Sequence, residues 1–259
     1  MTQPNDWIAW GQGNETLIFL HYFGGSALSW QWVAQELSAQ YRCLALNLPG
    51  FGGTSPLSEP SIAHFAGAIG QRITQQLGDQ PYTVIGHSMS AKLALQMASE
   101  ESDERIRQLI LVAPSPPTVE PMTPDEVAHM LKHNRKVAED NVNTAAKLPL
   151  TPERRQLALD TPLQIDEKTW RWWIQDGRKQ SIAERLDRVK APVTVLASQH
   201  DPIIDYRLVQ TDVMQLLPQA KLVTHPQAGH LLPLEDPAWL AQQIREAVTA
   251  QSAHVRERL

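Results

Sequence analysis

Short apolar runs alternate with amphipathic helical patterns along most of the chain, and this alternation restricts the fold more than any other feature. Six runs have the length of single strands, and several of them are apolar at nearly every residue, which is typical of strands covered on both faces. They lie at 17–21, 41–47, 82–86, 109–113, 193–198 and 221–224, and 7–10 is a candidate edge strand. Because parallel strands need crossover connections, the pattern predicts an α/β fold with a mostly parallel central sheet flanked by helices.

The alternation stops between about residues 115 and 190. Several prolines open this stretch, which then shows helical patterns without a convincing strand. Three helix-start signals fall within it, at Thr123, Thr151 and Asp166. Since the strand pattern resumes at residue 193, the sequence predicts one core, residues 1–114 and 191–259, with a helical cap inserted at 115–190.

Bulk composition restricts the functional class. The chain has 259 residues, of which 42% are hydrophobic and 20% charged, as in an ordinary globular protein. Its net charge of −5 gives no basic surface for nucleic acid or anionic lipid. A single cysteine excludes an internal disulfide, and the sequence predicts neither a secretion signal nor a membrane-spanning run. We therefore expect a cytoplasmic protein that acts on a small molecule, with its oligomeric state left open.

The segment GHSMS, residues 86–90, falls where an apolar run gives way to a helical pattern. Ligands of such sheets bind beyond the carboxyl ends of the strands, and Ser88 lies at one of those ends. Gly86 and Ser90 are small enough for a sharp turn that projects the Ser88 hydroxyl near the start of the next helix. Ser88 is therefore a candidate nucleophile, although so short a match also occurs by chance.

A serine hydroxyl needs an adjacent base, itself oriented by a carboxylate, to act as a nucleophile. Asp201 follows the predicted strand 193–198, and His230 follows 221–224. Each has a structural alternative, because Asp201 precedes Pro202 at a turn and His230 precedes the last helix. Three positions after strands, in the order Ser, Asp, His, nevertheless favour a catalytic triad at one edge of the sheet.

An oxyanion hole requires two backbone N–H groups aimed at the point where negative charge develops. The residue after the nucleophile, Met89, is the expected first donor. The segment HYFGGS, residues 21–26, follows another strand and contains two glycines that permit a tightly folded loop. We expect Phe23 to supply the second N–H, with Tyr22 as the nearest competitor. The glycines alternatively serve only the turn.

These motifs closely resemble those of the α/β-hydrolase superfamily over essentially the whole chain. The segments concerned are HYFGGS at 21–26, LPGFGGTS at 48–55, GHSMS at 86–90, Asp201, and GH at 229–230. The resemblance implies an eight-stranded sheet, a Ser88–His230–Asp201 triad, a helical cap and hydrolysis through an acyl-enzyme without a cofactor. The chain departs from the family at Tyr22 and Ser90, where glycine is common.

The reaction most favoured by this resemblance is serine-dependent cleavage of carboxylic esters in small to medium, partly apolar substrates. The same triad also suits C–C bond hydrolysis, lactone opening, perhydrolysis or acyl transfer. A non-catalytic small-molecule receptor is a third possibility, because some members of the superfamily bind ligands with little turnover. Ser88 argues against the dehalogenases and epoxide hydrolases of the family, which use aspartate as the nucleophile.

Tyr22, Trp170 and Trp173 are candidate residues of the substrate pocket. The helical spacing of the two tryptophans suits packing of the cap onto the core equally well, and both interpretations stay open. His129 and His133 have the spacing of a zinc-binding helix, but the glutamate that an HExxH motif requires is absent. The sequence therefore predicts no metal site.

Overall fold

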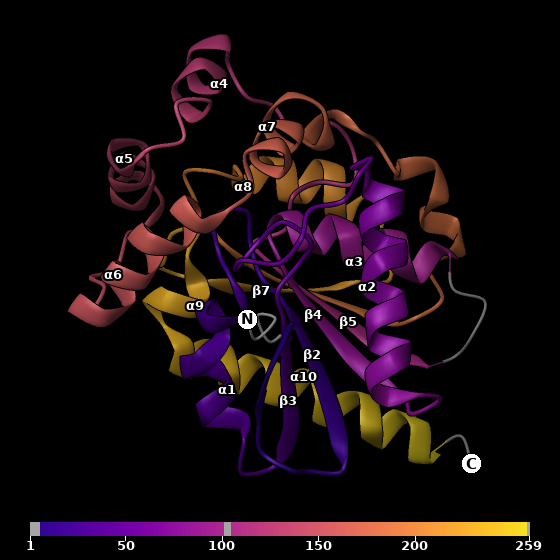
Figure 1. Cartoon of the computed structure of the whole chain (residues 1–259). Helices are drawn as coiled ribbons and strands as arrows, with labels where there is room; N and C mark the ends of the chain where they lie inside the picture. Colours follow the sequence, from indigo (N-terminus) through magenta and orange to yellow (C-terminus); the bar gives the residue numbers. More distant parts are fainter. Residues whose placement is uncertain (1–5, 101–104, 258–259) are drawn as a thin grey trace.

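A computed structural model describes residues 6–100 and 105–257, and the central sheet crosses the middle of the molecule (Figure 1). Its strands are β1 (Trp7–Trp10), β2 (Glu15–Leu20), β3 (Tyr41–Leu46), β4 (Tyr82–His87), β5 (Ile106–Val112), β6 (Val193–Ser198) and β7 (Lys221–His225). Their order is β1-β3-β2-β4-β5-β6-β7, with β1 antiparallel to β3 and all other pairs parallel. The predicted α/β fold with a mostly parallel sheet is confirmed.

The strand number differs from the eight that the family resemblance implied. The part of the chain that the structure describes forms seven strands. After β1 the chain turns at Gly11, which has a φ of 70°, and then enters β2 directly. One antiparallel strand, and not two, therefore precedes the parallel series within the described residues.

Alternate side chains of the strands build two separate cores, one on each face of the sheet. In β2, Ile18 and Leu20 pack on the side of α2 and α3, whereas Leu17 and Phe19 face α1 and α10. The helices of this core region are α1 (Gln31–Leu37), α2 (Ile62–Leu77), α3 (Met89–Glu100), α8 (Tyr206–Leu208), α9 (Leu232–Glu235) and α10 (Pro237–Glu257). The sheet is thus covered on both faces, as its near-continuous apolar strands predict.

The chain between β5 and β6 contains helices and no strand within its described residues. These helices are α4 (Pro124–Met130), α5 (Arg135–Ala145), α6 (Pro152–Asp160) and α7 (Glu167–Gln175), and they lie toward the top and left of Figure 1. Thr123, Thr151 and Asp166 each accept a hydrogen bond from a backbone N–H three residues on, as predicted for helix starts. The domain boundaries at 115 and 190 stay a prediction.

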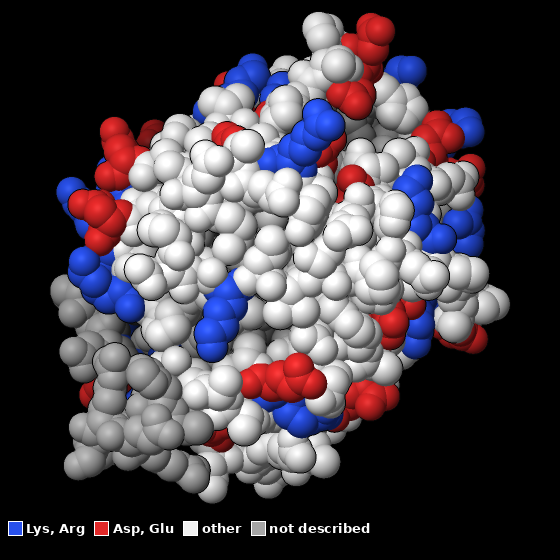
Figure 2. All heavy atoms as spheres, turned by 180° about the vertical axis from the view of Figure 1, so that it is seen from behind, with Lys and Arg blue, Asp and Glu red and all other residues white. Residues whose placement is uncertain are grey.

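The surface shows no single dominant charge on the face opposite that of Figure 1. There, basic and acidic side chains alternate around the margin of the described atoms (Figure 2). Among the described residues, none of the helices is both long enough and apolar enough to cross a membrane. Residues 1–5, 101–104 and 258–259 of the predicted core lie outside the described residues.

Candidate active site

The backbone at Ser88 is bent into a conformation that few side chains adopt. Ser88 has a φ of 54°, between the end of β4 and the start of α3. A Cβ atom at Gly86 would lie 2.6 Å from the carbonyl oxygen of Ser90, so only glycine fits there. The turn is fixed to β5, because the N–H of Ser88 donates to the carbonyl of Val112 at 2.9 Å. This sharp corner is the one that the GHSMS segment predicts.

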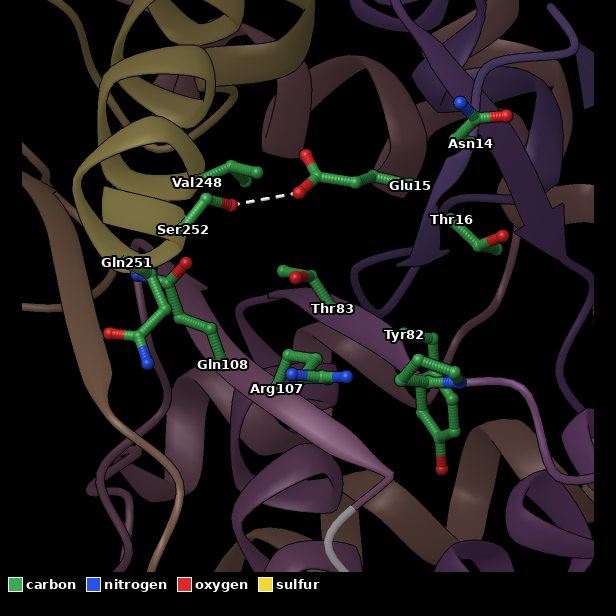
Figure 3. A pocket seen from close by; sticks show the side chains of 11 residues that line it. Asn14, Glu15, Thr16, Tyr82, Thr83, Arg107, Gln108, Val248, Gln251 and Ser252 are labelled. Carbon is green, nitrogen blue, oxygen red and sulfur yellow. Dashed lines mark hydrogen bonds between the residues drawn. The ribbon is translucent and has the colours of Figure 1, made fainter. Parts of the chain in front are cut away.

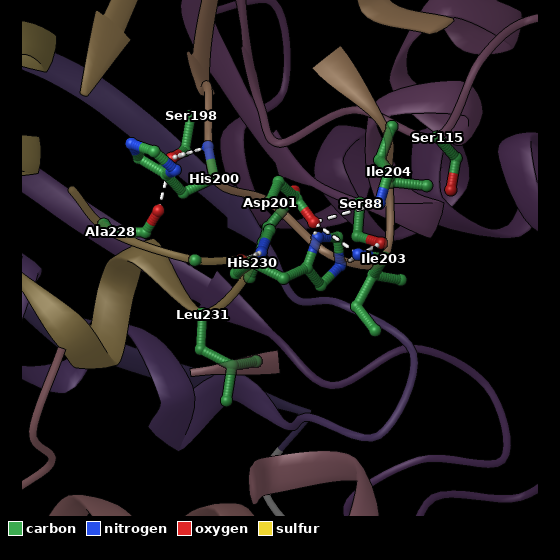
Figure 4. A network of polar contacts seen from close by, with 12 residues as sticks. Ser88, Ser115, Ser198, His200, Asp201, Ile203, Ile204, Ala228, His230 and Leu231 are labelled. Atoms are coloured by element: carbon green, nitrogen blue, oxygen red, sulfur yellow. Dashed lines mark hydrogen bonds and ion pairs between the residues drawn. The ribbon is translucent and has the colours of Figure 1, made fainter. Parts of the chain in front are cut away.

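Ser88, His230 and Asp201 come together beyond the carboxyl ends of three strands (Figure 4). His230 Nε2 lies 2.9 Å from Ser88 Oγ, and His230 Nδ1 lies 2.8 Å from Asp201 Oδ2. The other oxygen of Asp201 accepts from the N–H groups of Ile203 and Ile204, at 2.8 and 2.9 Å. Asp201 therefore starts a turn and faces the imidazole at once, so its two alternative roles are compatible.

Opposing effects act on the imidazole of His230, which is buried. Burial lowers the pKa of His230, but the charge of Asp201 and the hydrogen bond to it outweigh this effect, and the net pKa is raised. The carboxylates of Glu120 and Glu235 act in the same direction. With Nδ1–H donated to Asp201, the lone pair of Nε2 faces the Ser88 hydroxyl. This is the arrangement that a general base requires.

His87 fixes the backbone of His230 and does not carry a charge. Its Nε2 lies 2.8 Å from the carbonyl oxygen of His230, so Nε2 donates its proton there. Burial holds the pKa of His87 well below its usual value, and the nearby charge of His230 lowers it further. These contacts give His87 a structural role beside the site, through the backbone carbonyl of His230.

The two predicted oxyanion donors lie on neighbouring segments. Phe23 belongs to the loop after β2, and Met89 is the first residue of α3. Within the described residues, the backbone N–H groups of Phe23 and Met89 donate to no protein acceptor. The loop closes through a bond of 3.0 Å from the N–H of Gly25 to the carbonyl of Tyr22. A Cβ atom at Gly25 would lie 2.7 Å from the Tyr22 ring, so the glycine lets the loop fold back over this tyrosine.

His21 and Ser90 stabilise the loop after β2 through hydrogen bonds. His21 Nε2 accepts from the N–H of Leu48 at 3.2 Å, and Nδ1 donates to the carbonyl of Tyr22 at 2.9 Å. Burial lowers the pKa of His21 to about 4, which keeps the ring neutral for both contacts. The Ser90 hydroxyl donates to the carbonyl of His21. The serine that replaces a common glycine thereby connects α3 to the loop.

The predicted pocket residues all lie at the junction of the core and the helices between β5 and β6. Tyr22 is buried in a cluster with side chains of α5 and α6. The Trp170 ring stacks between Phe23, at 4.4 Å, and His133, at 4.3 Å. Trp173 lies 6.2 Å from the Phe23 ring. The structure thus brings the three aromatics close to the loop after β2, in contacts that also pack the two parts of the chain together.

A second buried charge cluster was not foreseen from the sequence. Lys92, one turn beyond Ser88, is fully buried and donates to the backbone carbonyls of Thr118, Gln180 and Arg178 at 2.8, 3.1 and 3.3 Å. Nearby, Glu120 accepts from the hydroxyl of Ser115 at 2.5 Å. The available signal was a lone lysine in the otherwise uncharged segment MSAKLALQM.

A separate cavity of about 240 Å³ lies at the opposite, N-terminal edge of the sheet (Figure 3). Its walls come from the first residues of β2, β4 and β5 and from the end of α10, where Ser252 donates to Glu15 at 2.8 Å. None of the predicted site residues lines this cavity. It is therefore distinct from the Ser88 site.

Comparison with known proteins decides the family. The sequence model of the alpha/beta hydrolase family matches residues 17–243. The chain belongs to this family. The fold and the predicted superfamily resemblance are thereby confirmed.

Relatives of this alpha/beta hydrolase include longer proteins. It is 36% identical over 105 residues to the dihydrolipoyllysine-residue acetyltransferase component of the acetoin cleaving system of Cupriavidus necator, a match covering 40% of this chain and 28% of that protein. It is 24% identical over 262 residues to the chloroplastic protein PHYLLO of Arabidopsis thaliana, covering 90% of this chain and 15% of that one. The matches thus span less than a third of either relative.

Among solved structures, this alpha/beta hydrolase resembles an esterase, EaEST, from Exiguobacterium antarcticum. The TM-score is 0.86 with 15% sequence identity, and the match covers 94% of each chain. At this identity the likeness concerns the fold. The chain therefore has a hydrolase fold that esterases also adopt.

Proposed function

We propose that this protein is a serine hydrolase that cleaves carboxylic esters of small to medium, partly apolar substrates through an acyl-enzyme. The observation that supports the proposal most strongly is the pair of contacts made by His230, 2.9 Å to Ser88 Oγ and 2.8 Å to Asp201 Oδ2. The two side chains that His230 contacts are far apart in sequence, and their atoms match the roles of nucleophile and orienting carboxylate.

In the proposed reaction, His230 Nε2 takes the proton of Ser88 as Oγ attacks the ester carbonyl. The N–H groups of Met89 and Phe23 stabilise the oxyanion, and Asp201 stabilises the imidazolium. His230 then protonates the leaving alcohol, which leaves an acyl group on Ser88. A water molecule, deprotonated by His230, releases the acid and restores the enzyme. No cofactor enters these steps.

The helices at 115–190 act as the cap in this proposal. Aromatic side chains of α7 meet the loop that holds Phe23, with Trp170 stacked on the Phe23 ring at 4.4 Å. Such a position favours an enclosed site for a small substrate with an apolar portion, lined in part by Tyr22, Trp170 and Trp173. The predicted cytoplasmic location belongs to the same proposal.

Acyl transfer is the second candidate, and the similarity to an acetyltransferase component favours it. Both reactions share the acyl-enzyme and differ in whether water or another nucleophile accepts the acyl group. Adding alcohols and thiols to an ester assay separates them, because a transferase forms new esters or thioesters at the expense of free acid.

The decisive test compares the wild type with Ser88→Ala on p-nitrophenyl esters of graded chain length. We expect the variant to lose about three to six orders of magnitude in kcat/KM, since the residual rate comes only from binding and the oxyanion donors. A fluorophosphonate probe should label Ser88 in the wild type and nothing in the variant. Near-normal ester hydrolysis by Ser88→Ala contradicts the proposed mechanism.

A further inference from the structure

One buried carboxylate, that of Glu235 in α9, accepts hydrogen bonds from four backbone N–H groups. Two of these belong to the residues on either side of His230, namely Gly229 and Leu231, each at 2.8 Å. The other two belong to Lys147 and Leu148, after α5, at 2.7 and 2.8 Å. A single side chain thus holds the loop of His230 and the end of a helix between β5 and β6.

The same two segments also contact each other directly. The N–H of His230 donates to the carbonyl of Ala145 at 2.8 Å. A Cβ atom at Gly229 would lie 2.1 Å from that same carbonyl oxygen, so only glycine allows this approach. The N–H groups of residues 229, 230 and 231 are therefore all bound, and each bond involves Glu235 or residue 145. The position of the His230 backbone depends on both.

We propose that Glu235 is a positioning residue for His230, and that its carboxylate couples residues 145–148 to the imidazole. The proposal rests on the proposed hydrolase function. A displacement of the 145–148 segment changes the position of the shared Glu235 carboxylate. The shifted carboxylate then changes the position of the backbone that bears His230. The segment that follows α5 thereby takes part in setting the distance between His230 Nε2 and Ser88 Oγ.

The chemistry of the acceptor explains why a carboxylate suits this position. An ionised carboxylate only accepts hydrogen bonds, so both of its oxygens are available to N–H donors. Here Oε2 accepts from the N–H groups of Lys147, Leu148 and Gly229, and Oε1 accepts from that of Leu231. Glutamine at position 235 would offer one oxygen and one NH2 group. At least one backbone N–H would then face another donor, and the loop would move to avoid it.

The charge of Glu235 also acts on the proton equilibrium of His230. The titratable groups that face the imidazole are Asp201 after β6, Glu120 after β5, Glu235 in α9 and His87 in β4. The three carboxylates raise the pKa of His230, against burial, which lowers it. Removing the Glu235 charge consequently lowers this pKa, and the acidic limb of the kcat/KM profile should move to lower pH.

The experiment compares Glu235→Gln and Glu235→Asp with two matched variants. Glu120→Gln removes a carboxylate that acts on His230 but contacts neither segment. Glu126→Gln removes an exposed carboxylate that caps α4 through hydrogen bonds with Thr123. We expect kcat to fall about tenfold to a hundredfold in both Glu235 variants, as for an ångström-scale displacement of a catalytic group, with KM little changed. Glu126→Gln should keep wild-type kinetics.

The pH profile separates positioning from charge. The acidic limb should move to lower pH in Glu235→Gln and in Glu120→Gln, while Glu235→Asp, which keeps the charge, should retain the wild-type limb. A kcat within twofold of the wild type in both Glu235 variants overturns the positioning role. A limb that does not move in Glu235→Gln overturns the electrostatic part.

Amide hydrogen exchange tests the coupling without any need for turnover. In Glu235→Gln, peptides covering 145–150 and 227–234 should lose protection together, while the rest of the core keeps it. Loss in only one of the two peptides, or loss across the whole chain, overturns the coupling. Failure of the wild type to hydrolyse esters or to react with fluorophosphonate contradicts the proposed function instead, and the exchange result still decides the role of Glu235.

Discussion

Two buried side chains, Glu235 and Lys92, connect the helices between β5 and β6 to the core with opposite charges. Glu235 accepts from four backbone N–H groups, and all four distances lie between 2.7 and 2.8 Å. Lys92 donates to three backbone carbonyls, at 2.8 to 3.3 Å. Glu235 holds the middle of the helical segment, whereas Lys92 holds its two ends.

The two sites differ in how fully hydrogen bonds compensate the burial of the charged group. Around Glu235, every contact is a short N–H bond to an anion, which is the strong kind of hydrogen bond. Around Lys92, burial lowers the pKa to about 8, although the charge of Glu120 opposes this effect. Burial of the Lys92 ammonium therefore costs free energy that its contacts do not fully offset. The Glu235 carboxylate, in contrast, accepts four backbone hydrogen bonds. We expect the loss of the two side chains to have unequal effects.

The largest expected effect is that of Glu235→Ala. This change leaves four buried N–H groups without their acceptor, and we expect it to lower the free energy of unfolding by about 3 to 5 kcal/mol. Urea denaturation at pH 7, followed by tryptophan fluorescence, measures this loss. A loss below that of Lys92→Met would reverse the ranking of the two sites.

The intermediate effect is that of Lys92→Met, which removes both the three bonds and the penalty for burying an ammonium. We expect a loss of about 1 to 2 kcal/mol at pH 7, since methionine keeps most of the apolar stem. The wild type should then gain stability relative to the variant as the pH rises.

The sign of this pH dependence follows from the lowered pKa. The folded state releases the Lys92 proton near pH 8, because burial lowers the pKa, and the unfolded state releases it near the usual lysine pKa of 10.5. Between these values the unfolded chain binds more protons, so the contribution of Lys92 to stability rises through this window by about 1 to 3 kcal/mol. Urea midpoints of both proteins at pH 7 and pH 10 measure it. A constant difference between them means that Lys92 titrates normally in the folded state.

The sequence was informative where the relevant signal is local. Each strand of the described residues was predicted within a few residues, and the signal was clearest for the central strands such as β2, β4 and β6, which are covered on both faces and largely apolar. Helix starts at Thr123, Thr151 and Asp166 were predicted because threonine and aspartate are common N-cap residues. The approach of Ser88, Asp201 and His230 followed from one rule, that the carboxyl ends of parallel strands share an edge.

The support of the site could not be predicted in the same way. Glu235 binds the N–H groups of residues 147 and 148, which precede it by more than 80 residues, and every residue except proline offers an N–H. No residue type at the far end marks such a contact. Glu235 was visible within the segment LLPLEDP, but its hydrogen-bond partners could be identified only from the fold.

The smallest expected effect is that of Glu126→Ala, which separates burial from bond type. Glu126 also accepts a backbone N–H, that of Thr123 at 2.7 Å, and this bond together with the Thr123 hydroxyl lowers its pKa. The site is exposed, so water replaces the lost acceptor and screens the charge. We expect a loss of at most about 1 kcal/mol, measured by the same urea titration. A loss equal to that of Glu235→Ala would mean that the carboxylate contact itself, and not its burial between two segments, determines the stability.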